Sequence, residues 1–208
     1  MLATDSRTAE MAKVTENSFR DVNIAFANEL SLICDEEGVN VWELIQLANR
    51  HPRVNILQPG PGVGGHCIAV DPWFIVARNP KQAKLIRTAR DVNDGKPLWV
   101  IDKVKARAEK FKHPVIACLG LTFKADIDDL RESPAMGIVR KLKEENIGNL
   151  LVCEPNIESH DEFELVNLEQ ALPLADIILL LVDHKQFRTL KAADLKEKIV
   201  IDTRGIIK

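Results

Sequence analysis

The sequence predicts an α/β protein in which a helical dimerisation region is followed by a domain built on a parallel sheet. Two observations lead to this fold class. Residues 6–112 have a mainly helical pattern, most clearly over residues 8–38, where apolar side chains recur at spacings of three and four. After residue 113 the pattern changes to short apolar runs separated by helical stretches, which is typical of parallel sheets covered by helices on both faces. We therefore expect two domains, residues 1–112 and residues 113–208.

The helical region begins with one long predicted helix over residues 8–38, which Gly38 is expected to end. Asn40 is placed to cap a second helix over residues 41–49. Two more helices are expected around residues 80–93 and 97–111, after a loop rich in proline and glycine over residues 53–66. So long a helical span with few turns favours a helix bundle or a dimerisation layer, and a plain helical core without a partner is the alternative.

Four short apolar runs predict the strands of the sheet, and two helices are expected between them. The predicted strands are residues 114–119, 150–154, 177–182 and 199–202, and the predicted helices are residues 134–145 and 168–175. In parallel sheets, ligands bind at the carboxyl ends of the strands. Those ends carry polar segments here, at residues 120–124, 154–156, 183–184 and 202–205.

Composition excludes several classes of protein. The formal net charge is -3 and the basic residues form no runs, so neither nucleic acid nor a membrane surface is the expected partner. The longest apolar run, residues 177–182, is far shorter than the roughly 20 residues of a membrane helix. The first seven residues do not resemble a signal peptide, so we expect a cytoplasmic protein. The cysteines show no paired spacing, so neither a metal site nor a disulfide framework is expected.

The most informative segment is QPGPGVGGHCIAVDP, residues 58–72, which joins a glycine-rich loop to Cys67 and to a helix start at Asp71. Glycines let a backbone approach a ligand closely or turn sharply. A tight turn with a buried cysteine is one interpretation. The other is a nucleophile near a helix amino terminus, where the dipole and free N–H groups lower the pKa of a thiol. The remaining cysteines lie in apolar runs and are expected in the core: Cys34, Cys118 and Cys153.

Two further groups of residues are candidates for binding. Along the first helix, Glu10, Lys13, Asn17 and Arg20 fall on one face, either as a solvated charged face or, through Lys13 and Asn17, as a site for an oxyanion. The second group follows the first strand.

That second group runs from Lys124 through Arg131 to Ser133, which is expected to cap a helix beginning at Pro134. Helix amino termini bind phosphates, and the two basic side chains add positive charge. A polar crossover loop is the alternative.

Together these segments resemble the UDP-glucose/GDP-mannose dehydrogenase family over essentially the whole chain. The motif GVGGHCIAVDP at residues 62–72 is similar to its catalytic-cysteine loop, and ExxKxxxN at residues 10–17 to its central helix. GLTFK at residues 120–124 and DLRESP at residues 129–134 are similar to the opening of its nucleotide-sugar domain. The nearest likeness is to the branch that oxidises UDP-N-acetylmannosamine, through residues 49–61 and 67–74.

The resemblance implies an enzyme of three parts: a Rossmann domain that binds NAD, a helical middle that forms a homodimer, and a Rossmann-like domain that binds the UDP-sugar. No GxGxxG follows a predicted strand in this sequence, so the NAD domain is expected to be absent from it. The resemblance also implies oxidation of the C6 alcohol of the sugar to a carboxylate in two hydride steps, for surface polysaccharide biosynthesis. We expect the isolated chain to be inactive.

Residue roles follow from the same resemblance. Cys67 attacks the intermediate aldehyde, Lys13 and Asn17 stabilise the oxyanion, and Asp71 positions water or relays a proton. Arg131 is implied to reach the cofactor phosphates, and Arg53 to enter the sugar site of the neighbouring subunit. The implied substrate-binding residues are Arg53, Leu57, Gln58, Gly60, Gly62 and Lys124.

One departure concerns the sugar. Members of the family that oxidise UDP-glucose carry lysine just before the aspartate, where this chain has Val70. This difference favours the N-acetylhexosamine branch. From the residues alone, a nucleotide-sugar-binding and dimerisation module without activity stays open beside the dehydrogenase.

Overall fold

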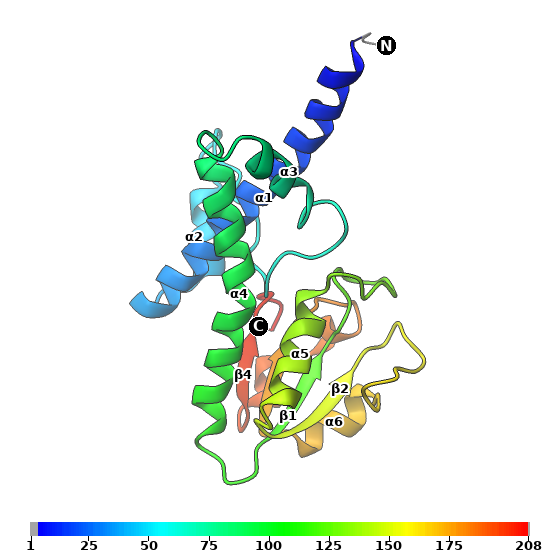
Figure 1. Ribbon diagram of the computed structural model, residues 1–208. Helices are drawn as coiled ribbons and strands as arrows, with labels where there is room; N and C mark the ends of the chain where they lie inside the picture. Colours follow the sequence, from blue (N-terminus) through cyan, green and yellow to red (C-terminus); the bar gives the residue numbers. More distant parts are fainter. Residues whose placement is uncertain (1–3, 208) are drawn as a thin grey trace. The chain divides into compact units, whose positions relative to one another are not determined.

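The computed structural model describes residues 4–207, which form two compact units (Figure 1). The helical unit contains the described residues up to 59 and residues 63–95, and the sheet unit contains residues 60–62 and the residues from 96 onward. Helix α4, Lys84–Ala108, belongs to both. The predicted division at 112/113 follows the change in sequence period. The compact sheet unit also includes the second half of α4, because Val100 and Val104 are buried in its core.

The first helices form where their capping residues predict. Helix α1 covers Ser6–Glu37, begins with the Asp5 side chain accepting from the Thr8 amide, and ends at Gly38 with a left-handed φ of 67°. Helix α2 covers Val41–Ala48, and the Asn40 side chain accepts from its first free amides, as expected. Helix α3 covers Asp71–Arg78 and has a proline in its first turn. These boundaries confirm the long first helix, the second helix and the helix start at Asp71.

Helix α1 has an unusual distribution of side chains. Its buried positions are mostly small or polar: Asn17, Ser18, Asp21, Ala25, Ala27, Asn28, Ser31 and Cys34. Large apolar side chains are exposed instead, at Met11, Phe19, Phe26 and Ile33. The exposed fraction is 68% for Phe19 and 51% for Phe26. This is the reverse of an ordinary amphipathic surface helix, whose apolar stripe faces the core.

Helix α4 corrects one prediction. The sequence indicated two helices divided near Pro97, but residues 84–108 form a single helix with Pro97 inside it. Proline removes a backbone N–H and usually kinks or breaks a helix interior. The turns that follow Pro97 bury Val100, Ile101 and Val104. Because packing of this kind supplies most of the stability of a helix in a protein, we attribute the continuity of α4 to it.

The sheet unit contains four parallel strands in the order β2-β1-β3-β4. The strands are β1 (Val115–Leu119), β2 (Asn149–Cys153), β3 (Ile177–Leu180) and β4 (Ile199–Asp202), each within about two residues of its predicted ends. Helices α5 (Pro134–Glu144) and α6 (Leu168–Leu174) connect them, with 3-10 turns at Phe187–Thr189 and Ala192–Leu195. Ser133 caps α5 as predicted.

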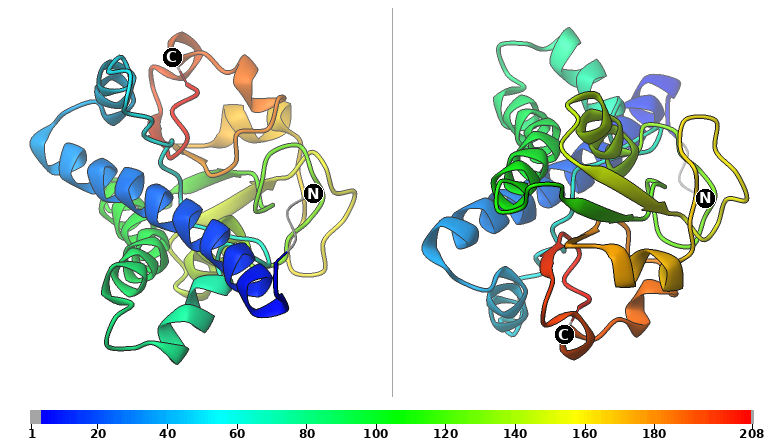
Figure 2. Two further views of the ribbon diagram at one scale, coloured as in Figure 1. Left: turned by 90° about the horizontal axis from the view of Figure 1, so that it is seen from above. Right: turned by 90° about the horizontal axis from the view of Figure 1, so that it is seen from below.

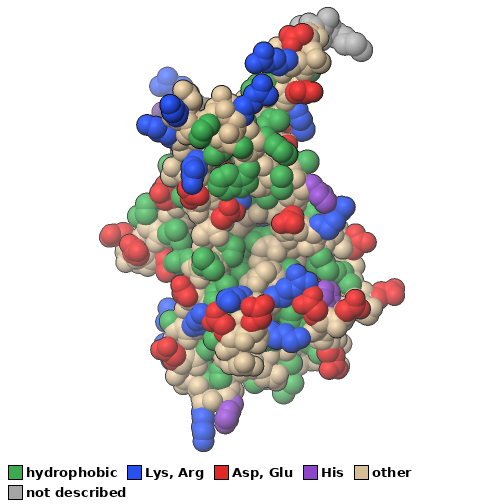
Figure 3. Space-filling view, viewed as in Figure 1, with side chains coloured by type: hydrophobic (Ala, Val, Ile, Leu, Met, Phe, Trp, Pro, Cys, Tyr) green, Lys and Arg blue, Asp and Glu red, His purple; other side chains and the backbone are tan. Residues whose placement is uncertain are grey.

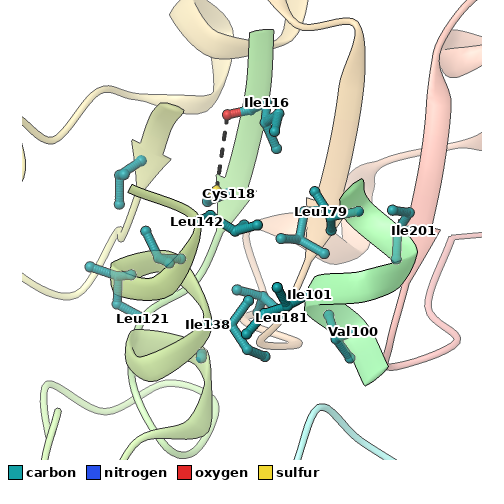
Figure 4. Close-up of a cluster of buried hydrophobic side chains, with 14 of the residues drawn as sticks. Val100, Ile101, Ile116, Cys118, Leu121, Ile138, Leu142, Leu179, Leu181 and Ile201 are labelled. Carbon is teal, nitrogen blue, oxygen red and sulfur yellow. Dashed lines mark hydrogen bonds between the residues drawn. The ribbon is translucent and has the colours of Figure 1, made fainter. Parts of the chain in front are cut away.

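Helices lie on both faces of the sheet (Figure 2), and an apolar cluster packs against each face. On one face, side chains of α5 and of the second half of α4 pack with Ile116, Leu179 and Ile201 (Figure 4). On the other, Ala117, Ile178 and Leu180 pack with residues of α6 and of the 3-10 turns. The predicted α/β fold with a helix-covered parallel sheet is therefore confirmed.

The strand order fixes where a ligand is expected. From β1 the chain crosses to β2 on one side and then returns to β3 on the other side of β1. Such a reversal is the topological switch point at which open parallel sheets bind ligands, beyond the carboxyl ends of their strands.

Over the sheet unit, acidic and basic side chains lie interspersed on the face shown in Figure 3. None of the described helices is long and apolar enough to cross a membrane.

Candidate functional site

Cys67 lies in a turn directly before helix α3. Its carbonyl oxygen accepts from the amides of Val70 at 3.2 Å and Asp71 at 2.8 Å, so the turn leads into the first residue of the helix. Cys67 is exposed, which contradicts the interpretation of a buried turn cysteine. The structure thus places an accessible thiol one turn before a helix amino terminus.

The other cysteines have a different environment. All of them are buried, and burial raises the pKa of the Cys153 thiol to about 12 and that of Cys118 still further. A thiol with so high a pKa carries almost no thiolate at neutral pH and is a poor nucleophile. Of the four cysteines in the sequence, Cys67 alone combines exposure with a polar turn.

Two of the other predicted catalytic residues meet beside this turn. The Asn17 amide donates to the Asp71 carboxylate at 2.5 Å, which ties α1 to the first residue of α3. Asn17 is 1% exposed, so it does not belong to a solvated face. Lys13, one turn earlier on α1, is exposed and pairs with Glu16 at 3.2 Å, while Arg20 is exposed as well. An exposed pair of this kind contributes little to stability and leaves the ammonium available to another anion.

The structure contains a buried polar network near Asn17 that was not predicted from the sequence. Asp21 accepts from Arg90 at 2.6 Å and from the Asn93 side chain at 2.8 Å, and Asn93 accepts from Asn28 at 2.9 Å. Arg90 also pairs with Asp94. Burial raises the pKa of the Asp21 carboxyl even though the Arg90 charge opposes the rise. Asp21 Oδ2 and Arg90 Nε are buried without a hydrogen-bond partner among the described residues.

The glycine-rich segment contributes to both units. Arg53, Leu57 and Gln58 belong to the helical unit, where Asn49 holds the backbone of the loop through two hydrogen bonds to Ile56. Gly60 and Gly62 belong to the sheet unit.

A side chain at Gly62 would meet rigid prolines, whereas one at Gly60 would meet the movable end of the Arg204 side chain. A Cβ atom on Gly60 would lie 2.6 Å from Arg204 Nη1, and one on Gly62 would lie 2.8 Å from Pro134 Cβ. Gly62 also has a φ of 149°, which favours glycine. The two residues therefore bring bare backbone to Arg204 and to the amino terminus of α5.

Lys124 occupies a turn beyond β1. Its carbonyl oxygen accepts from Thr122 Oγ1 at 2.9 Å, and its side chain is exposed. Arg131 is held by Asp129, which accepts from Arg131 Nε at 2.9 Å and Nη2 at 2.7 Å. Arg131 therefore has an internal partner, whereas Lys124 makes no ion pair within residues 4–207.

Arg204 is a basic residue of this edge that the sequence analysis did not select. It follows β4, and its Nε donates to Asp183 Oδ1 at 2.9 Å. Burial opposes ionisation of Asp183, but the Arg204 charge outweighs that effect and lowers the pKa of the carboxyl. The Asp202 carboxylate accepts from the backbone amides of Arg204, Gly205 and Ile207 and so fixes the turn. The signal in the sequence was an arginine two residues after the end of a predicted strand.

Comparison with known proteins gives two matches to family models. The central domain of the UDP-glucose/GDP-mannose dehydrogenase family matches residues 7–95, and the UDP binding domain of that family matches residues 117–208. These ranges cover the helical unit and most of the sheet unit.

Curated relatives include the NDP-N-acetyl-D-galactosaminuronic acid dehydrogenase of Ralstonia solanacearum, 66% identical over 99% of this chain and 49% of its own length. The UDP-N-acetyl-D-mannosamine dehydrogenase of Yersinia pestis is 62% identical over 99% of this chain and 52% of its own length. Among solved structures, the UDP-N-acetyl-mannosamine dehydrogenase Cap5O from S. aureus matches with a TM-score of 0.87 and 44% identity, over 100% of this chain and 50% of that one. The chain thus spans about half the length of the relatives that it matches.

Proposed function

Because the chain belongs to the UDP-glucose/GDP-mannose dehydrogenase family, we propose that it is the substrate-side part of an NAD-dependent UDP-N-acetyl-D-mannosamine 6-dehydrogenase. The product is the corresponding uronate, made for surface polysaccharides. The observation that carries the proposal is the exposed Cys67 thiol, which lies in a turn leading to Asp71 and its bonded partner Asn17.

The proposed chemistry uses Cys67 to divide a difficult oxidation into two parts. The C6 alcohol first loses a hydride and a proton to become an aldehyde. The Cys67 thiolate adds to the aldehyde carbon, and the thiohemiacetal loses a second hydride and a proton to become a thioester. Water then displaces the thiolate and leaves the carboxylate. A covalent intermediate is useful here because it presents the aldehyde oxidation level in a form that can again release hydride.

The neighbouring side chains suit these steps. Both the aldehyde addition and the hydrolysis place negative charge on an oxygen, and fixed donors stabilise such an oxyanion. Lys13 supplies an exposed ammonium, and Asn17 supplies an amide whose orientation is fixed by its bond to Asp71. Asp71, half-buried at the start of α3, is the proposed group that positions water or relays a proton.

The site of the NAD that accepts the hydrides is a further part of the proposal. The glycines of residues 60–65 do not follow a strand, and within residues 4–207 the one strand directly followed by glycine is β1, at Gly120. Among the described residues there is thus no strand–GxGxxG–helix unit to hold a pyrophosphate. We propose that NAD is held mainly by a region outside these 208 residues, with Arg131 released from Asp129 as the contribution of this chain.

For the UDP group we propose the carboxyl edge of the sheet. Lys124 offers an ammonium without an ion pair among the described residues, and Gly60 and Gly62 bring backbone without side chains to Arg204 and the α5 amino terminus. Positive charge and a helix amino terminus together suit the phosphates of a nucleotide. Leu57 and Gln58 precede this segment in the chain and complete the proposed substrate loop.

A homodimer is part of the proposal. The exposed apolar residues Met11, Phe19, Phe26 and Ile33 recur along α1 at intervals near two helical turns, as in a helix–helix seam. Within such a dimer, Arg53 is the proposed residue that reaches the sugar site of the partner. The exposed position of Arg53 in the loop is compatible with that role.

The most specific part of the proposal is which UDP-sugar is the preferred substrate. The name of one relative refers to N-acetyl-D-galactosaminuronic acid and that of the other to N-acetyl-D-mannosamine, so the relatives favour an N-acetylated amino sugar more strongly than one epimer. Val70, exposed beside Asp71, stands where a lysine is expected in enzymes of UDP-glucose. We therefore expect UDP-N-acetylmannosamine to be preferred, UDP-N-acetylgalactosamine to be the nearest competitor and UDP-glucose to be poor.

The test is an assay of NADH production by the intact protein that contains this chain, with each of the three UDP-sugars. Cys67→Ser should abolish turnover, and mass spectrometry should find a sugar adduct on residues 59–78 of that variant. Cys34→Ala, a change to a buried thiol, is the control and should keep turnover. UDP binding without NADH production from any of the three sugars would instead support a binding module without activity.

A further inference from the structure

A buried cluster of polar side chains lies beyond the carboxyl ends of β1, β2 and β3. Glu154 directly follows β2, and His184 follows β3. The His184 side chain is 0% exposed, as is that of Glu154. Two titratable groups buried together require a reason, because burial of a charge is costly unless it is paired. The proposed chemistry uses neither residue.

The hydrogen bonds of His184 define its protonation state. The backbone amide of Asp126 donates to His184 Nδ1 at 2.9 Å, and the Asn156 side chain lies 2.8 Å from the same nitrogen. A nitrogen that accepts a backbone N–H carries no proton. The ring proton is therefore on Nε2, which lies 3.1 Å from Glu154 Oε2 and donates to it. His184 is a neutral ring held by an acidic side chain on one side and by donors on the other.

Glu154 is the charged member of the pair. Burial opposes its ionisation, but the bond from His184 and those from the backbone amides of Leu121 and Asn156 outweigh burial, so the pKa of Glu154 lies below its ordinary value. Its Oε2 accepts from Leu121 at 2.7 Å and from Thr122 at 3.2 Å. The carboxylate therefore fixes the first residues after Gly120.

The cluster holds both ends of the turn that carries Lys124. At the beginning, Glu154 binds the amides of Leu121 and Thr122. At the end, Asp126 donates its amide to His184 and accepts from the Lys185 amide at 3.0 Å. Asp126 has a left-handed φ of 61°, a conformation that non-glycine residues adopt at a cost. That cost persists only where surrounding bonds hold the residue in place.

We infer that His184 is a positioning residue for nucleotide binding, which holds the 121–126 turn so that the Lys124 ammonium is presented to the phosphates of UDP. The inference rests on the proposed function for the identity of the ligand. His184 acts on the ligand only through Lys124 and is therefore a positioning residue and not a catalytic one. The charged groups that face it are Glu154 and the Asp126 carboxylate, whose Oδ1 lies 3.9 Å from Nδ1.

Two conservative substitutions separate the two bonds of the ring. In His184→Gln, the longer amide can still donate to Glu154 from the place of Nε2, but no acceptor remains for the Asp126 amide. In His184→Asn, the amide oxygen occupies the place of Nδ1 and still accepts from Asp126, while the donor to Glu154 is lost. If the Asp126 bond positions Lys124, His184→Gln should impair UDP binding more than His184→Asn.

The experiment measures UDP binding to the 208-residue chain by calorimetry in a double-mutant cycle. Lys124→Ala should raise the Kd for UDP by about tenfold or more, the effect of losing a hydrogen bond to a charged group. His184→Gln should raise the Kd by a similar factor alone, yet have little further effect when Lys124 is already alanine. A residue that acts only on stability would weaken binding equally in both backgrounds.

Amide exchange supplies a readout that needs no ligand. The Asp126 amide should be protected in the wild-type chain and in His184→Asn, and should exchange faster in His184→Gln. An unchanged Kd for the folded His184→Gln chain, beside a weakened Lys124→Ala chain, would refute the inference and leave the proposed UDP site intact. Failure of the wild-type chain to bind UDP, or binding indifferent to Lys124→Ala, would refute the proposed site and this inference with it.

Discussion

The longest helix of the helical unit and the central strands of the sheet unit bury different kinds of side chain. In the sheet unit, β1 and β3 are buried along almost their whole length and carry only apolar residues and one cysteine. In the helical unit, the longest helix buries asparagines, serines and an aspartate while Phe19 and Phe26 face outward. The sheet unit therefore completes its apolar core with its own residues. Within the helical unit, polar bonds hold the middle of α1 around Asp21, and a small apolar cluster forms around Val41 and Ile45. The large apolar side chains of α1 at Phe19 and Phe26 stay exposed.

Substitutions in the two regions should therefore lower stability for different reasons. Polar networks depend on each partner, because removal of one leaves the other buried and unpaired. Apolar cores lose stability in proportion to the volume that is removed. An outward apolar row has no role in the fold of one chain and becomes important only when a partner covers it.

Removal of a charged partner from the buried polar network should lower the free energy of unfolding the most. Asp21→Ala leaves Arg90 buried with only Asp94 as a charged partner, and breaking a buried pair in this way costs about 3–5 kcal/mol. Urea unfolding of the helical unit, followed by its tryptophans, measures the loss. The control is Asp91→Ala, a change to an acidic residue on α4, the helix that carries Arg90. It removes an exposed contact of 4.0 Å with Arg87, so it should change stability by about 0.5 kcal/mol or less. Equal losses of stability in the two variants would show that the buried pair contributes no more than the exposed contact.

On the apolar side, Leu142→Ala tests the closed core of the sheet unit. Leu142 is fully buried, and truncation of such a leucine costs about 2–5 kcal/mol through lost burial and the remaining cavity. Leu174, exposed at the end of α6, is the matched control and its change to alanine should be nearly neutral. Thermal unfolding of both variants gives the comparison. A neutral Leu142→Ala would show that this core is not tightly packed.

The outward row of α1 gives the next effect, on assembly and not on folding. Phe19→Asp should raise the dissociation constant of the proposed homodimer by about thirtyfold or more, because interface hot spots contribute about 2 kcal/mol or more. Leu47→Asp is the control, since Leu47 is also exposed but belongs to α2. Light scattering over a range of concentrations measures both. A wild-type monomer at micromolar concentration would exclude the dimer.

The smallest effect concerns pH. Because the folded pKa of Glu154 lies below its ordinary value of 4.5, its contribution to the stability of the sheet unit is complete above pH 4.5. That contribution is lost as the pH falls from 4.5 through the lowered folded pKa. Glu154→Gln should reduce the slope of unfolding free energy against pH in this acidic window and leave the slope above pH 5 unchanged. An unaltered acidic slope would show that other carboxyls account for it.

Prediction from sequence succeeded where local pattern and tertiary packing agree. Apolar runs followed by glycine or acidic residues predicted the strands, and Asn40 and Ser133 predicted helix starts through their own capping bonds. The split of α4 at Pro97 was wrong because the local preference of proline was overridden by burial of later residues. The placement of catalytic and binding roles stays a prediction.

The missed features share one physical cause. Asp21 and Arg90 are 69 positions apart, and each alone looks like a surface charge on an amphipathic helix. The pairing of Glu154 with His184 likewise depends on strand order, which brings the ends of β2 and β3 to the two sides of β1. Side-chain partners separated in the chain become visible only once the topology is known.

The contrast among the cysteines has a practical consequence for chemical labelling. Three thiols are buried, so an alkylating reagent applied to the folded chain at neutral pH should react at one sulfur. One label per chain would then indicate a fully folded preparation, and values above one would report chains whose core has opened. The same selectivity makes Cys67 the first sulfur exposed to peroxide, so a preparation stored without reductant should lose its reactive thiol before any change in fold can be detected.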